Sequence, residues 1–267
     1  ESPARGDHVA DVAEEQAPPP TFPPEAKNRP CFLVLDEERE LEGQKLRAGV
    51  WYFNMRPAKG HAPPLPDQDW VCSPVHIEAV TTDVHGSNFG RLLRFRTTLG
   101  KWRAWAMPME LLRGDASDLR GELLAMGVEI DPGAHRLLAQ YLQNRTPERR
   151  VLCALQTGWA SGRVFVLPSA AIGPDADGVA YQSGERASEE YPSSGTMEGW
   201  RQGVAALAIG NPLLMLAQSA AFAGPLLMLA NAESGGLHLV GDSSTGKTTA
   251  IEAACSVWGG PNFRRSW

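Results

Sequence analysis

The sequence predicts an α+β N-terminal module followed by the beginning of an α/β P-loop NTPase domain. Three observations lead to this fold class. A phosphate-binding motif lies at 241–249, between an apolar run and a helical pattern. Short apolar runs separated by turn residues dominate 31–195, as in a β-rich module. A stretch without charged residues at 202–232 precedes the motif and is typical of core helices.

The composition is that of a folded chain of one large or two ordinary domains. Its 267 residues are 43% hydrophobic, which is enough for a substantial core. The net charge of -6 argues against a protein that coats nucleic acid through bulk charge, but it is compatible with a local basic patch. The four cysteines form no C-x-x-C pair, the histidines have no metal-ligand spacing, and no secretory signal is visible. We therefore expect a cytoplasmic protein with reduced thiols.

Residues 1–30 are expected to form either a disordered tail or a linker from an upstream domain. The run at 16–24 contains five prolines, which exclude a helix or a central strand there.

The first part of the module, from 31 to about 108, predicts antiparallel strands. Apolar or alternating runs of strand length lie at 31–35, 49–53, 75–79, 90–98 and 101–107. A Pro-rich loop is expected at 57–67, and turns at 83–87 and 99–100 connect the last three strands into a meander.

The second part of the module alternates helices with further strands. A helix is expected at 117–126, ending at Gly127, and another after Asp131-Pro132. Strands are expected again at 151–155, 163–167 and 179–182.

The hairpin at 90–107 has two interpretations. Its basic residues are Arg91, Arg94, Arg96, Lys101 and Arg103, with no acid among them. Basic side chains beside Trp102 and Trp105 could hold a single-stranded nucleic acid by charge and stacking. Alternatively, Arg94 and Arg96 lie on the solvated face of a sheet whose other face is core. We favour the solvated face because the protein as a whole is acidic.

Residues 196–231 predict three helices rather than a membrane span. The first covers 196–209, the second starts at Asn211-Pro212 and runs to about Phe222, and the third starts at Gly224-Pro225. These breaks leave apolar pieces of roughly ten to fourteen residues, which suit core helices and are too short for a bilayer. We therefore expect no membrane insertion.

The phosphate-binding motif has the form G-x-x-x-x-G-K-[ST], after an expected strand at 237–240 and before an expected helix at 248–257. Its residues, all candidates for contact with ATP, are Gly241, Asp242, Ser243, Ser244, Thr245, Gly246, Lys247, Thr248 and Thr249. Backbone N–H groups of such a loop surround an anion at the positive end of the helix. Lys247, the catalytic candidate, would contact the β- and γ-phosphates, and the Thr248 hydroxyl would bind Mg²⁺.

A complete nucleotide hydrolase needs more than this motif. It requires an acidic residue at the end of another strand and usually an arginine for the transition state. The motif starts 26 residues before Trp267, and the only carboxylate after Thr249 is Glu252. We therefore expect a truncated domain, either because the chain is a fragment or because the remaining parts come from elsewhere.

Several motifs together resemble the domain of unknown function 927 family over residues 31–267. They are WVCSPVHIEAVTTD, GRLLRFR, WRAWAMPMELL, TGWASGRVFVLP, GTMEGW, GNPLLMLAQSAAFAGPLL and GGLHLVGDSSTGKTTAIEAACSVWGGP. The resemblance implies a primase- or helicase-associated protein of a prophage, plasmid or integrative element. It also implies that the acidic Walker B-type strand follows the tryptophan that matches Trp267, so autonomous ATP hydrolysis by this chain is in doubt.

Three functions are compatible with these patterns. The first is an ATP-dependent, helicase-like motor in DNA replication of a mobile element, with Mg-ATP at 241–249 and DNA or a replication partner such as a primase at the β-rich module. By analogy with such motors, the protein would form a homo-oligomer. The second is a partner- or DNA-binding scaffold with an incomplete nucleotide site. The third is a small-molecule P-loop kinase, which the long module before the motif disfavours.

Overall fold

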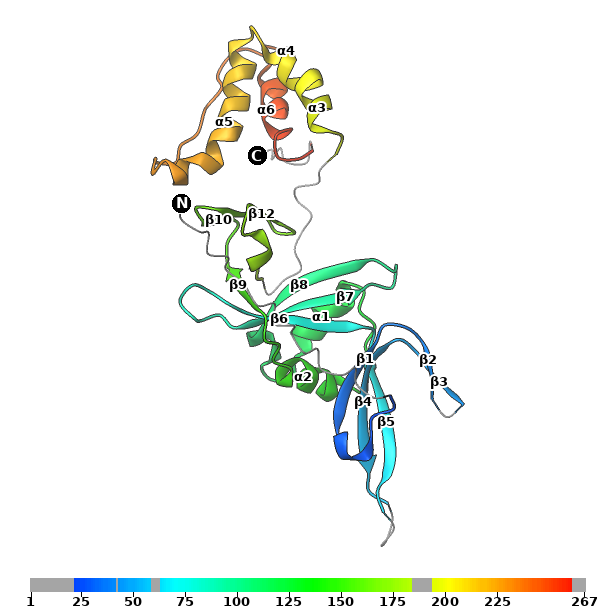
Figure 1. Ribbon diagram of the computed structural model, residues 1–267. Coiled ribbons are helices and arrows are strands. Elements are labelled where there is room, and N and C mark those ends of the chain that lie inside the picture. The colour runs from blue at the N-terminus through cyan, green and yellow to red at the C-terminus, as the bar shows by residue number, and fades with distance from the viewer. Residues whose placement is uncertain (1–21, 42, 59–62, 184–193, 261–267) are drawn as a thin grey trace, which may run out of the picture.

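The computed structural model describes residues 22–41, 43–58, 63–183 and 194–260. Figure 1 shows four parts along the molecule. The helices α3 to α6 lie at one end, the small sheet β10–β12 lies next to them, the largest sheet is in the middle, and β1, β4 and β5 project at the other end. Most of the predicted tail lies outside the described residues. Its last part packs against β4, where Phe22 meets the ring of Phe53 edge-on at 6.2 Å.

The largest sheet has five strands and carries the main core. In spatial order they are β13 (Val179–Tyr181), β9 (Arg150–Ala154), β6 (Val75–Thr82), β7 (Gly90–Arg96) and β8 (Trp102–Pro108). The meander β6–β7–β8 is antiparallel, which confirms the prediction from the turns. In contrast, β9 pairs parallel to β6, and β13 pairs parallel to β9.

Two helices allow this parallel pairing because they carry the chain from β8 back across one face of the sheet. They are α1 (Ser117–Ala125) and α2 (His135–Asn144). Leu119, Leu138 and Leu142 are fully buried against sheet residues such as Phe95. The Tyr141 hydroxyl donates a hydrogen bond of 2.7 Å to the Val75 carbonyl, which satisfies the buried phenol.

The five-stranded sheet curls so that its two edge strands approach each other. Ala106 on β8 forms a bridge with Gln182, which directly follows β13. Next to this bridge the Trp105 indole donates a hydrogen bond of 3.1 Å to the Ser183 carbonyl.

The projecting part is a three-stranded antiparallel sheet with its own small core. Its strands are β1 (Cys31–Leu35), β4 (Gly49–Arg56) and β5 (Leu65–Cys72), and the hairpin of β2 (Arg39–Leu41) and β3 (Gln44–Leu46) covers it. The predicted loop at 57–67 is shorter than expected, since β5 begins at Leu65 and pairs along almost the whole of β4. A small sheet of β10 (Gly158–Ser161), β11 (Val164–Val166) and β12 (Ala171–Ile172) precedes β13.

The C-terminal segment is helical. Its helices are α3 (Met197–Trp200), a π-helical turn (Arg201–Ala205), α4 (Ala206–Ala208), α5 (Pro212–Leu229) and α6 (Lys247–Cys255). Thr196 and Asn211 cap α3 and α5 by accepting hydrogen bonds from the backbone N–H groups of Gly199 and Leu214. These two helix starts were correctly predicted.

The predicted helix break at Gly224-Pro225 is wrong, because α5 continues through Pro225 to Leu229. Proline has no N–H group, so the Ala221 carbonyl four residues earlier loses its helical donor. The Trp258 indole supplies a replacement hydrogen bond of 2.9 Å to that carbonyl. A side chain distant in sequence therefore makes the proline tolerable inside the helix.

This continuity removes the length argument against a membrane span. In the part of the chain that the structure describes, α5 is the one helix long and apolar enough to cross a membrane, and 11% of it is buried. A single helix of this kind is weak evidence for a span. Tryptophan side chains from outside the helix bond two of its carbonyls, those of Ala221 and Pro225.

The strand expected at 237–240 is also absent, so that prediction is wrong for the described chain. A strand requires a neighbouring backbone to complete its hydrogen bonds, and no described strand pairs with these residues. Leu237 and Val240 are accordingly exposed. Residues 194–260 are helical without a sheet, and the α/β architecture expected of an NTPase domain is not formed there.

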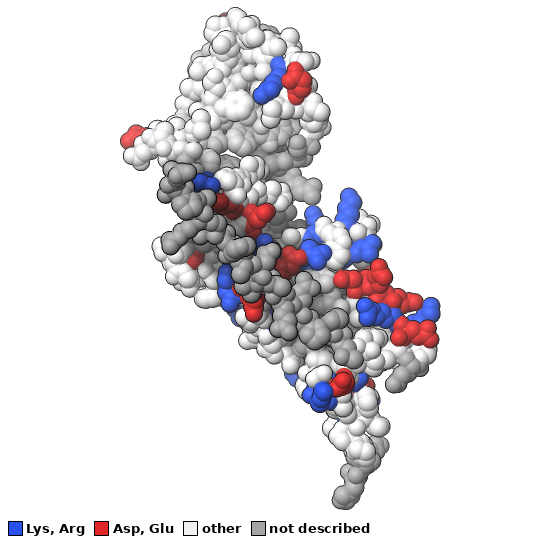
Figure 2. Space-filling model, viewed as in Figure 1, with Lys and Arg blue, Asp and Glu red and all other residues white. Residues whose placement is uncertain are grey.

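Charged residues are unevenly distributed over the surface. On the face shown in Figure 2, Lys, Arg, Asp and Glu are concentrated on the β-rich part, whereas the helical segment is almost uncharged. The acids and bases alternate on the β-rich part, so this face has no large patch of one sign.

Candidate functional site

The predicted phosphate loop ends at a residue whose backbone conformation is favourable only for glycine, and α6 begins directly after it. Gly246, the residue before α6, has a φ of 85°, in the left-handed region, and Ser244 has a φ of 63°. This backbone turns the chain sharply into Lys247, the first residue of α6. The first turn of a helix has N–H groups without helical acceptors, which makes it suitable for an anion.

Lys247 closes the loop on itself. Its ammonium donates hydrogen bonds to the Gly241 carbonyl at 2.7 Å and to the Asp242 carbonyl. The Thr245 hydroxyl also donates to the Asp242 carbonyl at 2.9 Å. The lysine side chain therefore folds back over the loop, and its N–H groups donate to carbonyl oxygens of the loop. Phosphate oxygens are acceptors of the same kind and could replace them.

The other predicted residues lie on the loop or on the first turn of the helix. Ser243 and Ser244 are in the turn, and Thr248 and Thr249 follow Lys247 on α6. Among the described residues no group of three or more His, Cys, Asp or Glu side chains could hold a metal ion. The loop backbone and the Lys247 ammonium fit a phosphate group. The loop fits Mg²⁺ only if phosphate oxygens and water supplied most ligands besides the Thr248 hydroxyl.

Two tryptophans that sequence reasoning missed hold α6 in place. The Trp200 indole donates a hydrogen bond of 2.9 Å to the Ser256 hydroxyl, just after α6. Trp258, two residues later, bonds the Ala221 carbonyl of α5 as described above. For Trp258 the sequence held one signal. A proline inside a helix leaves one carbonyl without its N–H donor, so a donor from outside the helix is needed.

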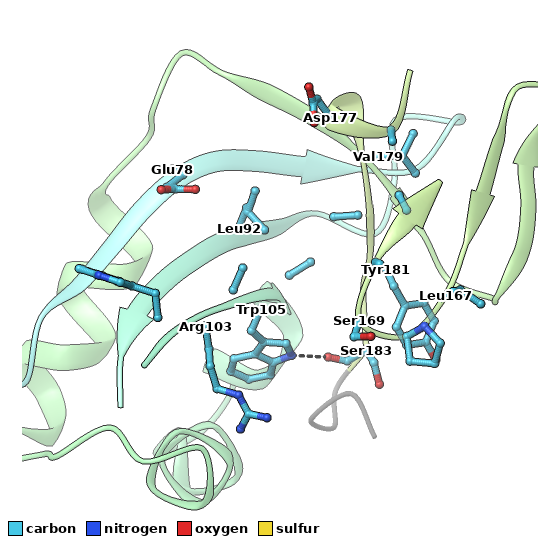
Figure 3. Close-up of a pocket in the computed structure, with 18 of the residues that line it drawn as sticks. Glu78, Leu92, Arg103, Trp105, Leu167, Ser169, Asp177, Val179, Tyr181 and Ser183 are labelled. Atoms are coloured by element: carbon cyan, nitrogen blue, oxygen red, sulfur yellow. Dashed lines mark hydrogen bonds between the residues drawn. The ribbon is translucent and has the colours of Figure 1, made fainter. Parts of the chain in front are cut away.

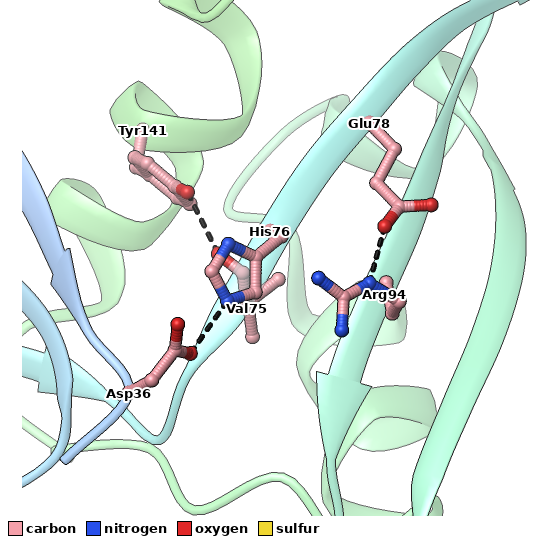
Figure 4. A network of polar contacts seen from close by, with 6 residues as sticks. All are labelled: Asp36, Val75, His76, Glu78, Arg94 and Tyr141. Carbon is pink, nitrogen blue, oxygen red and sulfur yellow. Dashed lines mark hydrogen bonds and ion pairs between the residues drawn. The ribbon is translucent and has the colours of Figure 1, made fainter.

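The predicted basic hairpin is formed, and its face assignment is correct. Leu93 and Phe95 are fully buried, whereas Arg94 and Arg96 lie on the opposite face. Figure 4 shows that Arg94 forms an ion pair with Glu78 on the neighbouring strand β6. Its guanidinium also lies 4.3 Å from the centre of the Trp102 ring. Arg94 is therefore neutralised within the sheet and is a poor candidate for a phosphate contact.

The other three candidates differ from Arg94. The Arg96 side chain bonds the Gly100 carbonyl at 3.2 Å and stabilises the turn between β7 and β8. Lys101 is exposed in that turn. Arg103 lies on the edge strand β8 and lines a cavity, together with Trp102 and Trp105. The structure therefore does not bring the four basic residues together into one site.

The cavity has a volume of about 640 Å³ and lies at the curled sheet, near its edge strands β8 and β13. Figure 3 shows residues of β6, β7, β8 and β13 around it, among them Glu78, Leu92, Arg103 and Tyr181. The segment from Leu167 to Ala171 closes another side. Sequence reasoning missed Arg149 and Tyr181, because only the curl of the sheet brings them near β8.

Three of the four cysteines are poor nucleophiles. Burial raises the pKa of the Cys31, Cys72 and Cys153 thiols, which keeps them protonated at neutral pH. All four cysteines are free, as expected.

Comparison with known proteins identifies a family and a similar solved structure. The family model described as "Domain of unknown function (DUF927)" matches residues 31–267. The chain belongs to this family. No curated protein matches the DUF927 chain. A solved structure described as "SCCmec type IV Cch - active helicase" matches it with a TM-score of 0.51 and 20% sequence identity.

This match covers 82% of the DUF927 chain and 40% of the helicase chain. The DUF927 chain therefore spans about two fifths of the helicase's length. At this identity the similarity shows a shared fold.

Proposed function

We propose that this DUF927 chain binds Mg-ATP at residues 241–249, as part of a helicase-like motor in DNA replication of a mobile element. The observation that carries the proposal is the loop itself. Gly246 has the left-handed backbone the motif needs, and Lys247 lies over the loop with its donors on exchangeable carbonyl oxygens. The shared fold with an SCCmec helicase supports a role in a motor.

In this proposal each part of the chain has a role. Residues 1–30 are a tail or linker, residues 31–195 contact DNA or a replication partner, and residues 196–267 carry the nucleotide site. Lys247 contacts the β- and γ-phosphates, and Thr248 places its hydroxyl on the magnesium ion. The protein is cytoplasmic and not inserted in a membrane, which is supported by the indole donors bonded to α5. Homo-oligomer formation is part of the same proposal.

The test is calorimetric titration of the chain with Mg-ATP. We expect binding by the wild type and its loss in Lys247→Ala, because this variant removes the ammonium group of the loop. The matched control is Lys45→Ala, since Lys45 is an exposed lysine on β3 that pairs with Glu38, remote from the loop. Equal binding by wild type and Lys247→Ala would refute the assignment of the site.

A second candidate function is a non-enzymatic scaffold with an incomplete nucleotide site. Two observations favour it. The described residues hold no cluster of acidic metal ligands, and large apolar side chains of α5 such as Met215, Leu226 and Met228 are exposed. If a folded wild-type chain does not bind Mg-ATP, the scaffold becomes the better description of this chain.

A further inference from the structure

We propose that the open edge of strand β8 binds an extended segment of a partner protein, which pairs with β8 as an added strand and places one side chain in the neighbouring cavity. The inference deepens the proposed function, in which residues 31–195 contact DNA or a replication partner, and it rests on that function for the partner's role in replication. The binding itself depends on β8 and the cavity, which consist of different residues from the nucleotide loop.

The first argument is the direction of the backbone groups of β8. In an antiparallel pair, every second residue exchanges hydrogen bonds with the neighbouring strand. The Thr97 N–H bonds the Lys101 carbonyl at 2.9 Å, just before β8 begins. By the register of the two strands, odd-numbered residues of β8 therefore bond β7, and the backbone groups of even-numbered residues point away from β7. The bridge between Ala106 and Gln182 lies on this outer side.

The second argument is that two of these outward-facing residues lack a neighbouring strand. Trp102 and Ala104 are exposed, and β8 is the edge strand of its sheet. Among the described residues, no group bonds their outward N–H donors and C=O acceptors. Unpaired groups of this kind are a template for another strand, and strand addition to a sheet edge is a recurring mode of peptide recognition. The open stretch ends at Ala106, where the edge is already bridged.

The third argument is the cavity beside this edge. Its volume of about 640 Å³ lies in the usual range for sites that hold a small ligand. Ala104 lines it, and much of the remaining lining is aliphatic or aromatic, including Leu92, Leu167 and Tyr181 (Figure 3). The side chains of an added strand alternate between the two faces of the sheet. A large side chain of the partner segment at one of these positions therefore has a cavity of suitable size next to it.

The charges of the lining do not favour an ion in the cavity. Glu78 forms an ion pair with Arg94, and Arg149 donates a hydrogen bond of 3.1 Å to the backbone carbonyl of Asp177, an acid of the same lining. By strand register, Arg103 belongs to the face of the sheet that the helices cover. The side chain that enters the cavity is therefore apolar, such as phenylalanine or leucine.

The fourth argument selects the partner by charge. Lys101 is exposed just before the open edge, and Arg96 is exposed beside it with its guanidinium on the Gly100 carbonyl. Residues 90–107 contain no acid, so a second copy of β8 would bring only further bases to this edge. Like charges on paired strands are destabilising, whereas opposite charges stabilise the pair. The edge thus matches a foreign segment that carries an acidic residue next to Lys101.

The experiment selects phage-displayed peptides of about ten random residues, roughly twice a common strand length, on the wild-type chain. An enriched peptide is then synthesised with a fluorescein label, and its affinity is measured by anisotropy. We expect enriched peptides to alternate, with a large apolar residue and an acid. A selection that enriches no peptide would overturn the proposal.

Variants of the edge test where the peptide binds. Ala104→Pro should weaken binding at least about tenfold, because proline removes an outward N–H and its ring blocks the approach of a strand. The fold should tolerate it, since this N–H does not bond β7, and circular dichroism checks this. Ala104→Ser keeps the N–H and should bind like wild type. Lys101→Ala should weaken binding about threefold. Arg136→Ala, which removes an exposed arginine of α2, should change nothing.

A second readout uses the wild-type chain and does not depend on how a variant folds. N-methylation of alternate peptide residues removes the N–H groups on one side of the added strand. One alternate set should abolish binding, and the other should leave it nearly unchanged. Equal effects of the two sets, or equal binding by Ala104→Pro, would overturn the proposal. A wild-type dimer that Ala104→Pro dissociates would also overturn it, in favour of pairing between copies. Lys247→Ala should bind the peptide normally, so failure of the nucleotide site is distinguishable.

Discussion

Asp83 shows how one exposed side chain organises a turn. Between β6 and β7 its carboxylate accepts hydrogen bonds from the backbone N–H groups of His85 and Ser87 and from the Asn88 amide. The bond from the Ser87 backbone is the main cause that lowers the pKa of Asp83 below its ordinary value of 3.8, followed by the bond from the Asn88 side chain. The ionised form is therefore favoured by the folded chain.

This shift predicts a pH dependence. A carboxyl group with a lowered pKa in the folded state contributes stability at higher pH, and the contribution is lost as the pH falls below about 3.8. We expect Asp83→Asn to unfold at a lower temperature than wild type at about pH 7, and the difference to shrink in this acid range. Thermal unfolding at both pH values measures it. The control is Glu148→Gln, because Glu148 is an exposed acid outside the turn that Asp83 organises. A difference that does not depend on pH would contradict the assignment.

At the scale of elements, α5 depends on the segment after α6 through one hydrogen bond. Pro225 deprives the Ala221 carbonyl of its helical donor, and the Trp258 indole replaces it. An internal carbonyl without a donor costs about 1 kcal/mol. The continuity of α5 and the position of α6 are therefore coupled.

A double-mutant cycle tests this coupling. Trp258→Phe should lower the free energy of unfolding by about 1 kcal/mol, plus the effect of the smaller ring, in the wild-type background. In a Pro225→Ala background the introduced alanine supplies its own N–H to the Ala221 carbonyl, so the same change at Trp258 should cost less. Denaturant unfolding of the four proteins gives the difference. Equal costs in both backgrounds would show that the indole bond does not compensate for the proline.

At the scale of the whole molecule, the small sheet β10–β12 lies between the cavity at the curled sheet and the helical segment that carries the phosphate loop. The segment after β11 lines the cavity, from Leu167 to Ala171. On the other side the Trp159 indole of β10 donates a hydrogen bond of 2.7 Å to the Pro225 carbonyl, and the Phe165 ring of β11 lies 6.0 Å from the Trp258 ring. One element therefore contacts both the cavity and the helices that hold the phosphate loop.

This arrangement predicts that the small sheet supports α5. Trp159→Phe removes the indole hydrogen bond to the Pro225 carbonyl and should speed the hydrogen exchange of the α5 amides around this residue. Trp70→Phe removes a similar indole donor in β5 and should leave that exchange unchanged. Exchange that Trp159→Phe does not alter would exclude this bond as a support of α5.

Local patterns were sufficient for much of this molecule. Alternation predicted β6, β7 and β8 and the faces of Arg94 and Phe95, because the side-chain period of a strand needs no knowledge of its neighbours. The helices that start after Thr196 and Asn211 were also predicted, and the sequence motifs led to the DUF927 family. The turn at Gly246 and the following helix were also predicted, since the spacing of their residues is local.

Only the tertiary structure decided the remaining features, because each depends on groups far apart in the sequence. The parallel pairing of β9 and β13 and the curl that forms the cavity require α1 and α2 to return the chain across the sheet. Pro225 stays inside α5 because the Trp258 indole, distant in the sequence, bonds the freed carbonyl. The run at 237–240 has strand-like residues but forms no strand, since strand hydrogen bonds need a neighbouring backbone that no described strand provides. The sequence alone thus determined which local structures are possible, and contacts between distant segments decided which of them form.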